Sequence, residues 1–146
     1  NPSVRVQAQC GPLKVTLSNG KVVTISAKPN AKDAKVSPDN QTVGWVEGEL
    51  KDYRKEPWFF PSRLVFWKGG KTVMTFTPSK LGYVYVWAFL ENGAKVGIAS
   101  AGMHGPTTYE LVDMKTGKRE DMAMNYDKVK KPWVKKMPDS DHLLED

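Results

Sequence analysis

The chain has 146 residues, and its 22 basic against 16 acidic side chains give a formal net charge of +6. A content of 40% hydrophobic and 10% aromatic residues excludes a disordered chain, and this length lets one domain bury its own core without disulfide bonds. No apolar run reaches the roughly 20 residues of a membrane-spanning helix, so we expect a globular protein with no membrane span.

The first twelve residues form a lead-in with little periodic pattern. The chain begins with Asn1 rather than with methionine, which leads us to expect that a signal peptide or part of an expression sequence preceded it. Cys10 is the single cysteine, so by itself it forms neither an internal disulfide nor a metal site. We interpret it as an ordinary thiol, with lipid attachment in an exported precursor as the alternative.

A short phrase occurs three times along the chain and predicts three β-hairpins. In each copy, apolar residues alternate with others up to a turn at Gly20, Gly70 or Gly117, and a lysine follows the glycine directly. Glycine supplies the positive φ that tight hairpin turns need, and Asn19-Gly20 is a particularly strong signal. We expect the three hairpins at residues 13–26, 63–76 and 108–124.

A second phrase recurs between the hairpins. Residues 36–45 line up with residues 89–98 at an offset of 53 positions, while the hairpin glycines are 50 and 47 positions apart. An internal period near fifty residues is a repeat signature. In the first copy, Ser37-Pro38-Asp39-Asn40 predicts a turn between two strands, the second of which covers residues 42–48.

Residues 49–61 interrupt the strand pattern, because they are charged at first and then rich in aromatic and proline residues. We expect a long inserted loop whose exposed tip recognises a partner, since Trp, Tyr and Arg are enriched at interface hot spots. The alternative is that the aromatic residues fold back over the core as a lid. The candidate partner-binding residues of this segment are Tyr53, Arg54, Trp58, Phe59 and Phe60.

Residues 81–89 predict a strand in the middle of a sheet. Four aromatic residues alternate with smaller apolar ones between Tyr83 and Phe89, so that both faces of the strand are apolar. A turn at Glu91-Asn92-Gly93 leads into a return strand in which small residues predominate. The loop that follows, residues 102–108, is a shorter counterpart of residues 49–61, so we expect both loops at one edge of the sheets.

The chain offers little material for catalysis, with His142 near the C-terminus and His104 on the loop at residues 102–108. Because Tyr109 and Glu110 follow closely, a small hydrolase or lyase that uses His104 with these residues is one alternative function. His104 is also a candidate for partner binding. The chain has no phosphate-binding loop, no dinucleotide fingerprint and no closely spaced metal ligands, and we expect no cofactor and no metal.

Near the C-terminus, five lysines surround two aromatic residues in the segment 126–136, and an acidic end follows at residues 139–146. This mixture suits a polyanion, whereas the plainer interpretation is a solvated tail interrupted by proline. Polyanion binding is therefore a second alternative function, although we do not expect nucleic acid as a partner. The candidate residues are Lys128, Lys130, Lys131, Trp133, Lys135 and Lys136.

The repeated phrases resemble the WD-like β-propeller repeats of the TolB type. Blades of that family carry a phrase of the form Ser-Pro-Asp-Gly-Lys-x-Ile-Ala followed by a hairpin with a Thr-Gly-Lys turn. Residues 37–44 and Thr116-Gly117-Lys118 match these two elements. The resemblance spans residues 13–120 and implies antiparallel blades and an exported protein. Propellers close with about four to eight blades, whereas this chain has material for about two or three.

We therefore expect an all-β fold of antiparallel, propeller-type hairpin sheets with too few blades to close a ring. One β domain at residues 13–125 lies between the lead-in, residues 1–12, and a C-terminal tail, residues 126–146. The sheets pack face to face as a sandwich, or two chains complete one another, or the chain is a fragment. Pairing of edge strands into a homodimer is the alternative to a monomer.

The expected function is that of a non-catalytic binding module of the bacterial envelope, or of a secreted one, with a periplasmic or extracellular location. We expect it to recognise a protein or a glycan through the loops at residues 49–61 and 102–108.

Overall fold

The computed structural model describes residues 5–7, 11–16, 20–78, 82–102, 105–124 and 130–138. The chain divides into two compact units, residues 1–77 and residues 78–146, termed here the N-terminal and the C-terminal unit. Each is described by itself. The boundary between them falls inside residues 13–125, the region that the sequence led us to treat as one β domain.

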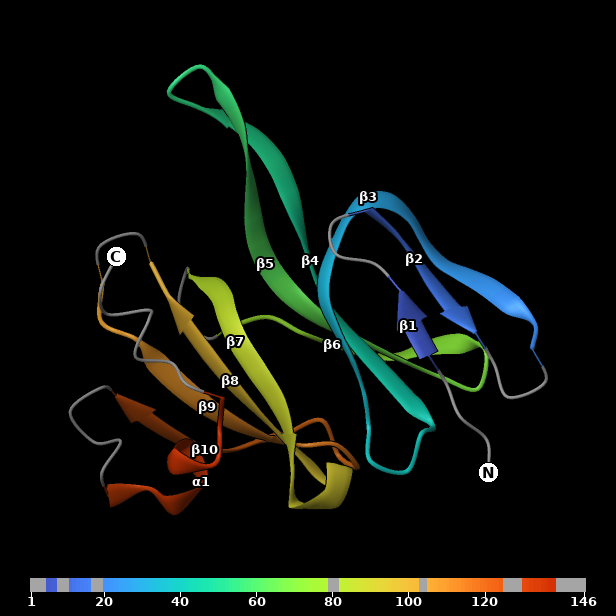
Figure 1. The fold of residues 1–146 in the computed structure, drawn as a ribbon. Coiled ribbons are helices and arrows are strands. Elements are labelled where there is room, and N and C mark those ends of the chain that lie inside the picture. The colour runs from blue at the N-terminus through green and yellow to red at the C-terminus, as the bar shows by residue number, and fades with distance from the viewer. Residues whose placement is uncertain are drawn as a thin grey trace. The chain divides into compact units, whose positions relative to one another are not determined.

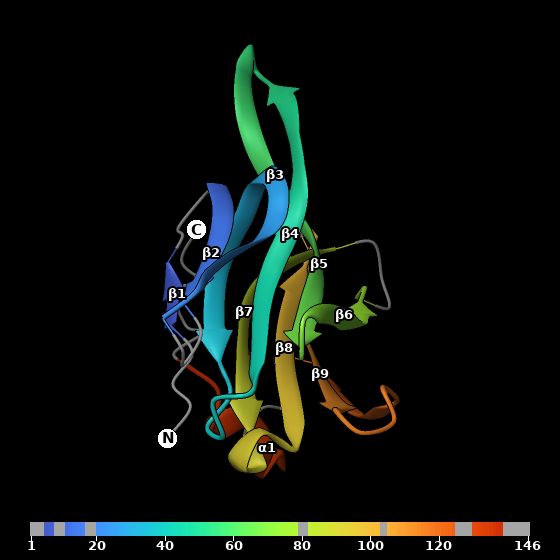
Figure 2. The ribbon, with the colours of Figure 1, turned by 90° about the vertical axis from the view of Figure 1, so that its right-hand side faces the viewer.

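The N-terminal unit is a six-stranded antiparallel sheet whose strands are neighbours in chain order (Figure 1). The strands are β1 (Arg5–Gln7), β2 (Gly11–Thr16), β3 (Val22–Val36), β4 (Thr42–Tyr53), β5 (Glu56–Lys68) and β6 (Lys71–Phe76). Figures 1 and 2 show that β4 and β5 extend well past the other strands of this sheet.

One face of this sheet carries the core of the N-terminal unit. Val43 pairs with Trp67 and Trp45 pairs with Val65 across β4 and β5, and the period of two along each strand directs all four side chains to the same face. Burying one side chain of this size contributes about 1.5–3 kcal/mol. The buried residues of the cluster are Val15, Ala31, Val43, Trp45, Val65 and Trp67.

The C-terminal unit is a four-stranded antiparallel sheet with a short helical segment against it. Its elements are β7 (Tyr83–Leu90), the 3₁₀ turn η1 (Glu91–Gly93), β8 (Lys95–Ala101), β9 (Thr108–Asp113), β10 (Arg119–Met124) and helix α1 (Pro132–Lys135). The strands again follow chain order, with β7 and β10 at the two edges. In the described part of the chain, neither helical element is long and apolar enough to cross a membrane.

Helix α1 and the residues after it cover one face of the second sheet. Val134 and Met137 are 6% and 7% exposed and pack in one cluster with Leu90 of β7 and Tyr109 and Leu111 of β9. The sequence led us to expect a tail from residue 126 onward. Within that region, the described segment 130–138 instead belongs to the core of the C-terminal unit.

The three predicted hairpins are present as the β2–β3, β5–β6 and β9–β10 pairs. Gly20, Gly70 and Gly117 have φ values of 86°, 92° and 73°, which is the left-handed region that favours glycine. The two predicted turns between β3 and β4 and between β7 and β8 are present as well. Each contains an asparagine, Asn40 or Asn92, with φ 61°.

The internal repeat of the sequence coincides with a repeated order of strands. Strands β3 to β6 and strands β7 to β10 form two four-stranded sets with the same chain order. Directly after the first turn of each set, Val36 pairs with Val43 and Phe89 pairs with Val96. The predicted fold class is thus confirmed: the protein is all-β and antiparallel, and none of its described sheets closes into a barrel.

The predicted central position of the strand at residues 81–89 is wrong, because β7 lies at the edge of its sheet. The predicted alternation is also interrupted by a bulge between Val84 and Val86. Val84 pairs with Ser100 and Trp87 pairs with Ile98, two positions away on β8, so Val84 and Trp87 share a face. One inserted residue therefore moves Tyr83 to the face opposite Trp87.

Candidate functional site

The N-terminal unit carries a two-stranded extension. The ladder between β3 and β4 ends at Glu47, and the ladder between β5 and β6 ends at Leu64. From there to the turn, β4 and β5 pair only with each other in the described sheet. These residues, 48–61, are termed the arm, and Figure 1 shows the arm in green, projecting from its own sheet. The prediction of an inserted loop at residues 49–61 is therefore wrong, because these residues continue two strands.

The turn of the arm explains why its sequence resembles that of a loop. Arg54 and Lys55 form a two-residue turn and both have positive φ, 54° and 68°, without the glycine or asparagine that usually marks such turns. In a hairpin with this turn, the first cross-strand pair is hydrogen-bonded and the next is not. Pro57 and Pro61 fall at positions without a ladder hydrogen bond, so the arm tolerates both prolines.

The arm exposes large apolar side chains on both faces. Trp58 is 51% exposed and Leu50 is 55% exposed. Trp58 pairs with Lys51, the neighbour of Leu50, so the two apolar side chains point to opposite faces. On the Trp58 face, the Tyr53 ring packs edge to face against the indole at a centroid distance of 5.6 Å. The guanidinium carbon of Arg54 lies 5.3 Å from the Tyr53 ring centroid, which adds a cation to this aromatic cluster.

The remaining aromatic residues of the arm are half-buried. The Lys32 ammonium of β3 lies 4.9 Å from the Phe59 ring centroid, which ties the Leu50 face of the arm to the neighbouring strand. Phe60 lies on the Trp58 face, nearer the base of the arm. The alternative prediction, that the aromatic residues form a lid over the core, is wrong for Trp58, since half of its surface is exposed.

The base of the arm is a close approach of two backbones. The register of β4 against β5 shifts between Glu47 and Gly48, so that Gly48 faces Pro61. A Cβ at Gly48 would overlap the carbonyl oxygen of Phe60, and only glycine fits this position without a backbone movement. Bulges of this kind bend a strand pair, so Gly48 determines how the arm leaves the sheet.

An ion pair next to this bulge fixes the first residues of the base. One carboxylate oxygen of Glu47 accepts a hydrogen bond from Arg63 at 2.9 Å, and the other accepts one from the indole N–H of Trp45 at 2.8 Å. The Glu47 side chain is 14% exposed, so solvent screens this arrangement less than a surface ion pair. Trp45 belongs to the core cluster, which connects the base of the arm to the core.

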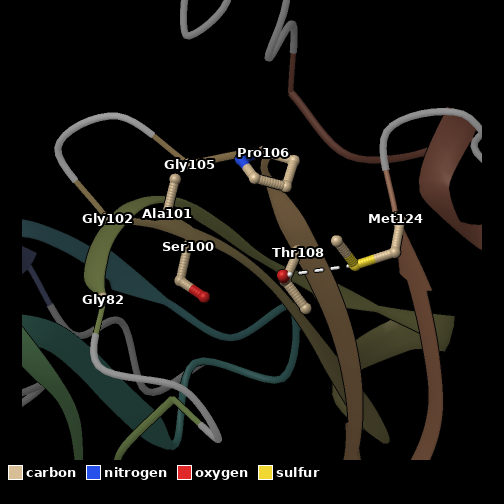
Figure 3. Close-up of a pocket in the computed structure, with 8 residues that line it drawn as sticks. All are labelled: Gly82, Ser100, Ala101, Gly102, Gly105, Pro106, Thr108 and Met124. Atoms are coloured by element: carbon tan, nitrogen blue, oxygen red, sulfur yellow. Dashed lines mark hydrogen bonds between the residues drawn. The ribbon is translucent and has the colours of Figure 1, made fainter.

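The C-terminal unit contains a cavity of about 200 Å³ at the end of its sheet where β8 ends and β9 begins (Figure 3). Ser100 of β8 lies directly opposite Thr108 of β9, which in turn lies opposite Met124 of β10. The Thr108 hydroxyl donates a weak hydrogen bond to the Met124 sulfur at 3.5 Å. The described lining residues are Gly82, Ser100, Ala101, Gly102, Gly105, Pro106, Thr108 and Met124.

This cavity lies at the base of the loop at residues 102–108 that the sequence singled out. His104 itself falls outside the described residues, so the structure places only its neighbours, among them Gly102 and Gly105. Sequence reasoning did not select Ser100 or Met124. The available signal was the run of small residues at the end of β8, which leaves space beside the sheet.

Tyr109 and Glu110, the residues that the sequence offered as partners of His104, lie on different faces of their sheet. They are adjacent on β9, so their side chains point to opposite faces of the sheet. Tyr109 is part of the core beneath α1, while the Glu110 carboxylate accepts a hydrogen bond from Arg119 at 3.2 Å. Both residues are buried, with 0% of their surface exposed.

Two residues of the lysine-rich segment form hydrogen bonds with the sheet. Asp121 of β10 accepts hydrogen bonds from Lys131 at 3.1 Å and from the indole N–H of Trp133 at 2.9 Å. These contacts, the indole N–H first, hold the pKa of the Asp121 carboxyl below its usual value. Of the remaining candidates for polyanion binding, Lys130, Lys135 and Lys136 are exposed, and Lys128 lies outside the described residues.

Within the described ranges, no group of three His, Cys, Asp or Glu side chains is placed to hold a metal ion. No model of a known protein family matches the chain, and a search of curated proteins finds no significant relative. A functional assignment therefore depends on the geometry of the arm and of the cavity.

Proposed function

We propose that the protein is a non-catalytic binding module that docks a partner protein against the arm. The observation that carries this proposal is the exposure of Trp58 and Leu50 on opposite faces of a two-stranded extension. An isolated two-stranded hairpin is only marginally stable in water. A partner that covers the arm would remove this apolar surface from water and reinforce the pairing of the strands.

The composition of the arm supports a protein as the partner. Trp, Tyr and Arg dominate interface hot spots, and the arm places Tyr53, Arg54 and Trp58 in one contiguous cluster. Charges of both signs surround this cluster, since Lys51 pairs with Glu49 at 3.3 Å on the same face. Such an apolar centre with a polar rim is typical of protein interfaces.

A photocrosslinking experiment tests the proposal. Benzoylphenylalanine replaces Trp58 in one variant and Val73, which is 47% exposed on β6, in a matched control. The protein is irradiated in an extract of its native cells, and adducts are identified by mass spectrometry. We expect an adduct with another protein from position 58 that is absent from position 73. Unlabelled wild-type protein should suppress this adduct at a concentration about tenfold lower than Trp58→Ala/Phe59→Ala protein requires.

Equal competition by the two proteins would contradict docking through the arm. Adducts that form equally from positions 58 and 73 would also contradict docking through the arm. An adduct with a second copy of the chain would instead show that the arm docks against that copy in a homodimer. Thermal unfolding of the double variant serves as the control, because a large loss of stability would mark these residues as part of the core.

The propeller relationship and the exported location belong to the same proposal. The TolB-like phrase at residues 37–44 supports both, and the repeated order of four strands supports the propeller relationship alone. Cell fractionation with an antibody against the protein tests the location. Recovery with cytoplasmic markers would contradict export.

A further inference from the structure

We propose that the cavity of the C-terminal unit binds a small uncharged ligand, about the size of one ring, that carries a single hydrogen-bonding group. The cavity lies in the unit that does not carry the arm, so this inference goes beyond the proposed docking function and does not depend on it. Three observations support it: the volume of the cavity, the chemistry of its lining, and the buried Ser100 hydroxyl, which forms no hydrogen bond with another described residue.

The volume indicates how large a group this partly open cavity can hold. The cavity has about 200 Å³, whereas an engineered cavity of about 150 Å³ in another protein holds benzene. Four of the described lining residues are glycine or alanine, namely Gly82, Ala101, Gly102 and Gly105. Because these residues have little or no side chain, the ligand would contact backbone on this side, with the Pro106 ring and the Met124 thioether as larger apolar surfaces (Figure 3).

The hydroxyl group of Ser100 determines the polar character of the ligand. Ser100 is 4% exposed, and its side chain forms no hydrogen bond with another described residue, whereas the Thr108 hydroxyl bonds to Met124. Figure 3 shows the Ser100 side chain among the residues that line the cavity, projecting from β8 toward the Thr108 side. A buried hydroxyl that finds no partner among the described residues is unfavourable there, and a ligand with one donor or acceptor would satisfy it.

The described part of the lining favours an uncharged ligand over an ionic one. No charged side chain is among the described residues of its lining, so an ion there would lose its hydration without a counter-charge. The nearest acidic side chain along β9 on the same face, that of Glu110, is already paired with Arg119 at 3.2 Å. The lining therefore favours a neutral ligand with one polar group, such as an alcohol, a phenol or a single amide.

Three probes of equal ring size test the inference on the full chain: phenol, benzene and benzoate. Binding is followed by amide chemical shifts, with the backbone resonances of residues 100, 101, 105 and 108 as the readout. We expect phenol to bind in the millimolar range and to shift these resonances. Benzene, which lacks the hydroxyl group, should bind about three- to tenfold more weakly, and benzoate should not bind.

Two variants separate the role of Ser100 from a general effect on the fold. Ser100→Ala should lower the affinity for phenol to that for benzene while leaving benzene binding intact, because only the hydrogen bond is lost. Thr75→Ala, which removes an exposed hydroxyl on β6, should change neither affinity. Retention of benzene binding by Ser100→Ala also shows that this variant folds.

The inference would be overturned by three results. The first is that phenol causes no saturable change in the amide chemical shifts of residues 100, 101, 105 and 108, which would mean that only water enters the cavity. The second is an equal affinity for phenol in the wild-type and Ser100→Ala proteins. The third is binding of benzoate as tight as that of phenol.

Discussion

Tyr53 and Trp58 pack edge to face across the arm, with their ring centroids 5.6 Å apart and their planes inclined by 79°. They are diagonal neighbours, because Tyr53 pairs with Glu56 and Trp58 pairs with Lys51. The contact restricts the indole while half of its surface stays exposed. A side chain that is ordered before binding loses less conformational entropy in a complex, so this pair presents Trp58 as a ready contact.

Replacement of two tryptophans, one at a time, should show that the arm contributes less to the free energy of unfolding than the core does. Trp58→Ala should lower the free energy of unfolding by only about 0.5–1.5 kcal/mol, the range for loss of an aromatic pair. Trp45→Ala, at a position 1% exposed, should cost about 3–5 kcal/mol because it leaves a cavity in the core. Urea unfolding at neutral pH measures both values. Similar losses for the two variants would show that the arm is part of the core.

A methyl group at the base of the arm should disturb the strand pair. Gly48→Ala places a Cβ against the Phe60 carbonyl, and backbone must move to accept it, which costs about 1–3 kcal/mol. We expect shifted amide resonances throughout residues 48–61. Gly105→Ala is the matched control, because its Cβ would meet its nearest atom only at 3.9 Å. An unchanged spectrum of the Gly48→Ala protein would contradict the close approach.

Asp121 should make the C-terminal unit sensitive to acid. Its carboxyl pKa is held below the usual value, first by the hydrogen bond from the Trp133 indole. A lowered pKa in the folded protein means that the stabilisation is complete above the ordinary aspartate pKa of about 4 and is lost as the pH falls through the folded value.

Carbon-detected NMR titration of the Asp121 carboxyl measures this shift directly. Trp133→Phe removes the indole N–H but keeps an aromatic ring, so the pKa of Asp121 should rise toward its ordinary value. The pH dependence of unfolding should become shallower in Asp121→Asn protein. A folded-state pKa at the ordinary value in the wild type would refute the assignment.

Met137 should be a core residue despite its place near the C-terminus. It is 7% exposed, and its sulfur lies close to the position that a Cβ at Gly97 would occupy. Met137→Ala should cost about 2–5 kcal/mol, whereas Lys136→Ala, at an exposed neighbour, should stay within about 0.5 kcal/mol. Chemical denaturation compares the two. Equal stabilities of the Met137→Ala and Lys136→Ala proteins would place the segment 130–138 outside the core.

Polyanion binding is best tested by charge removal, because deletion of residues 126–146 would also remove Val134 and Met137 from the core. Lys130, Lys135 and Lys136 are exposed, and their replacement by glutamine should leave the fold intact. If each contacts one phosphate of single-stranded DNA, the salt dependence of binding should fall by about 0.7 per lysine. Fluorescence titration of a labelled oligonucleotide at several salt concentrations measures this slope. A wild-type protein without salt-dependent binding would eliminate this alternative.

The sequence by itself determined the turns and the class of fold. A tight turn depends on the conformations of two or three residues, so Gly20, Gly70 and Gly117 were sufficient to locate three hairpins. The repeated phrases likewise indicated an internal repeat, and the structure shows it as two four-stranded sets. These features are local, and the physical preferences that produce them act between residues close in sequence.

Only the tertiary structure decided the arm, the edge position of β7, the burial of Met137 and the cavity. Prolines at residues 57 and 61 indicated a loop, yet the long ladder of β4 with β5 imposes positive φ on Arg54 and Lys55 and extends the strands. Likewise, Ser100 lines a cavity because strand register sets it opposite Thr108. Strand neighbours, register and packing depend on free energies summed over residues distant in sequence, which no local pattern contains.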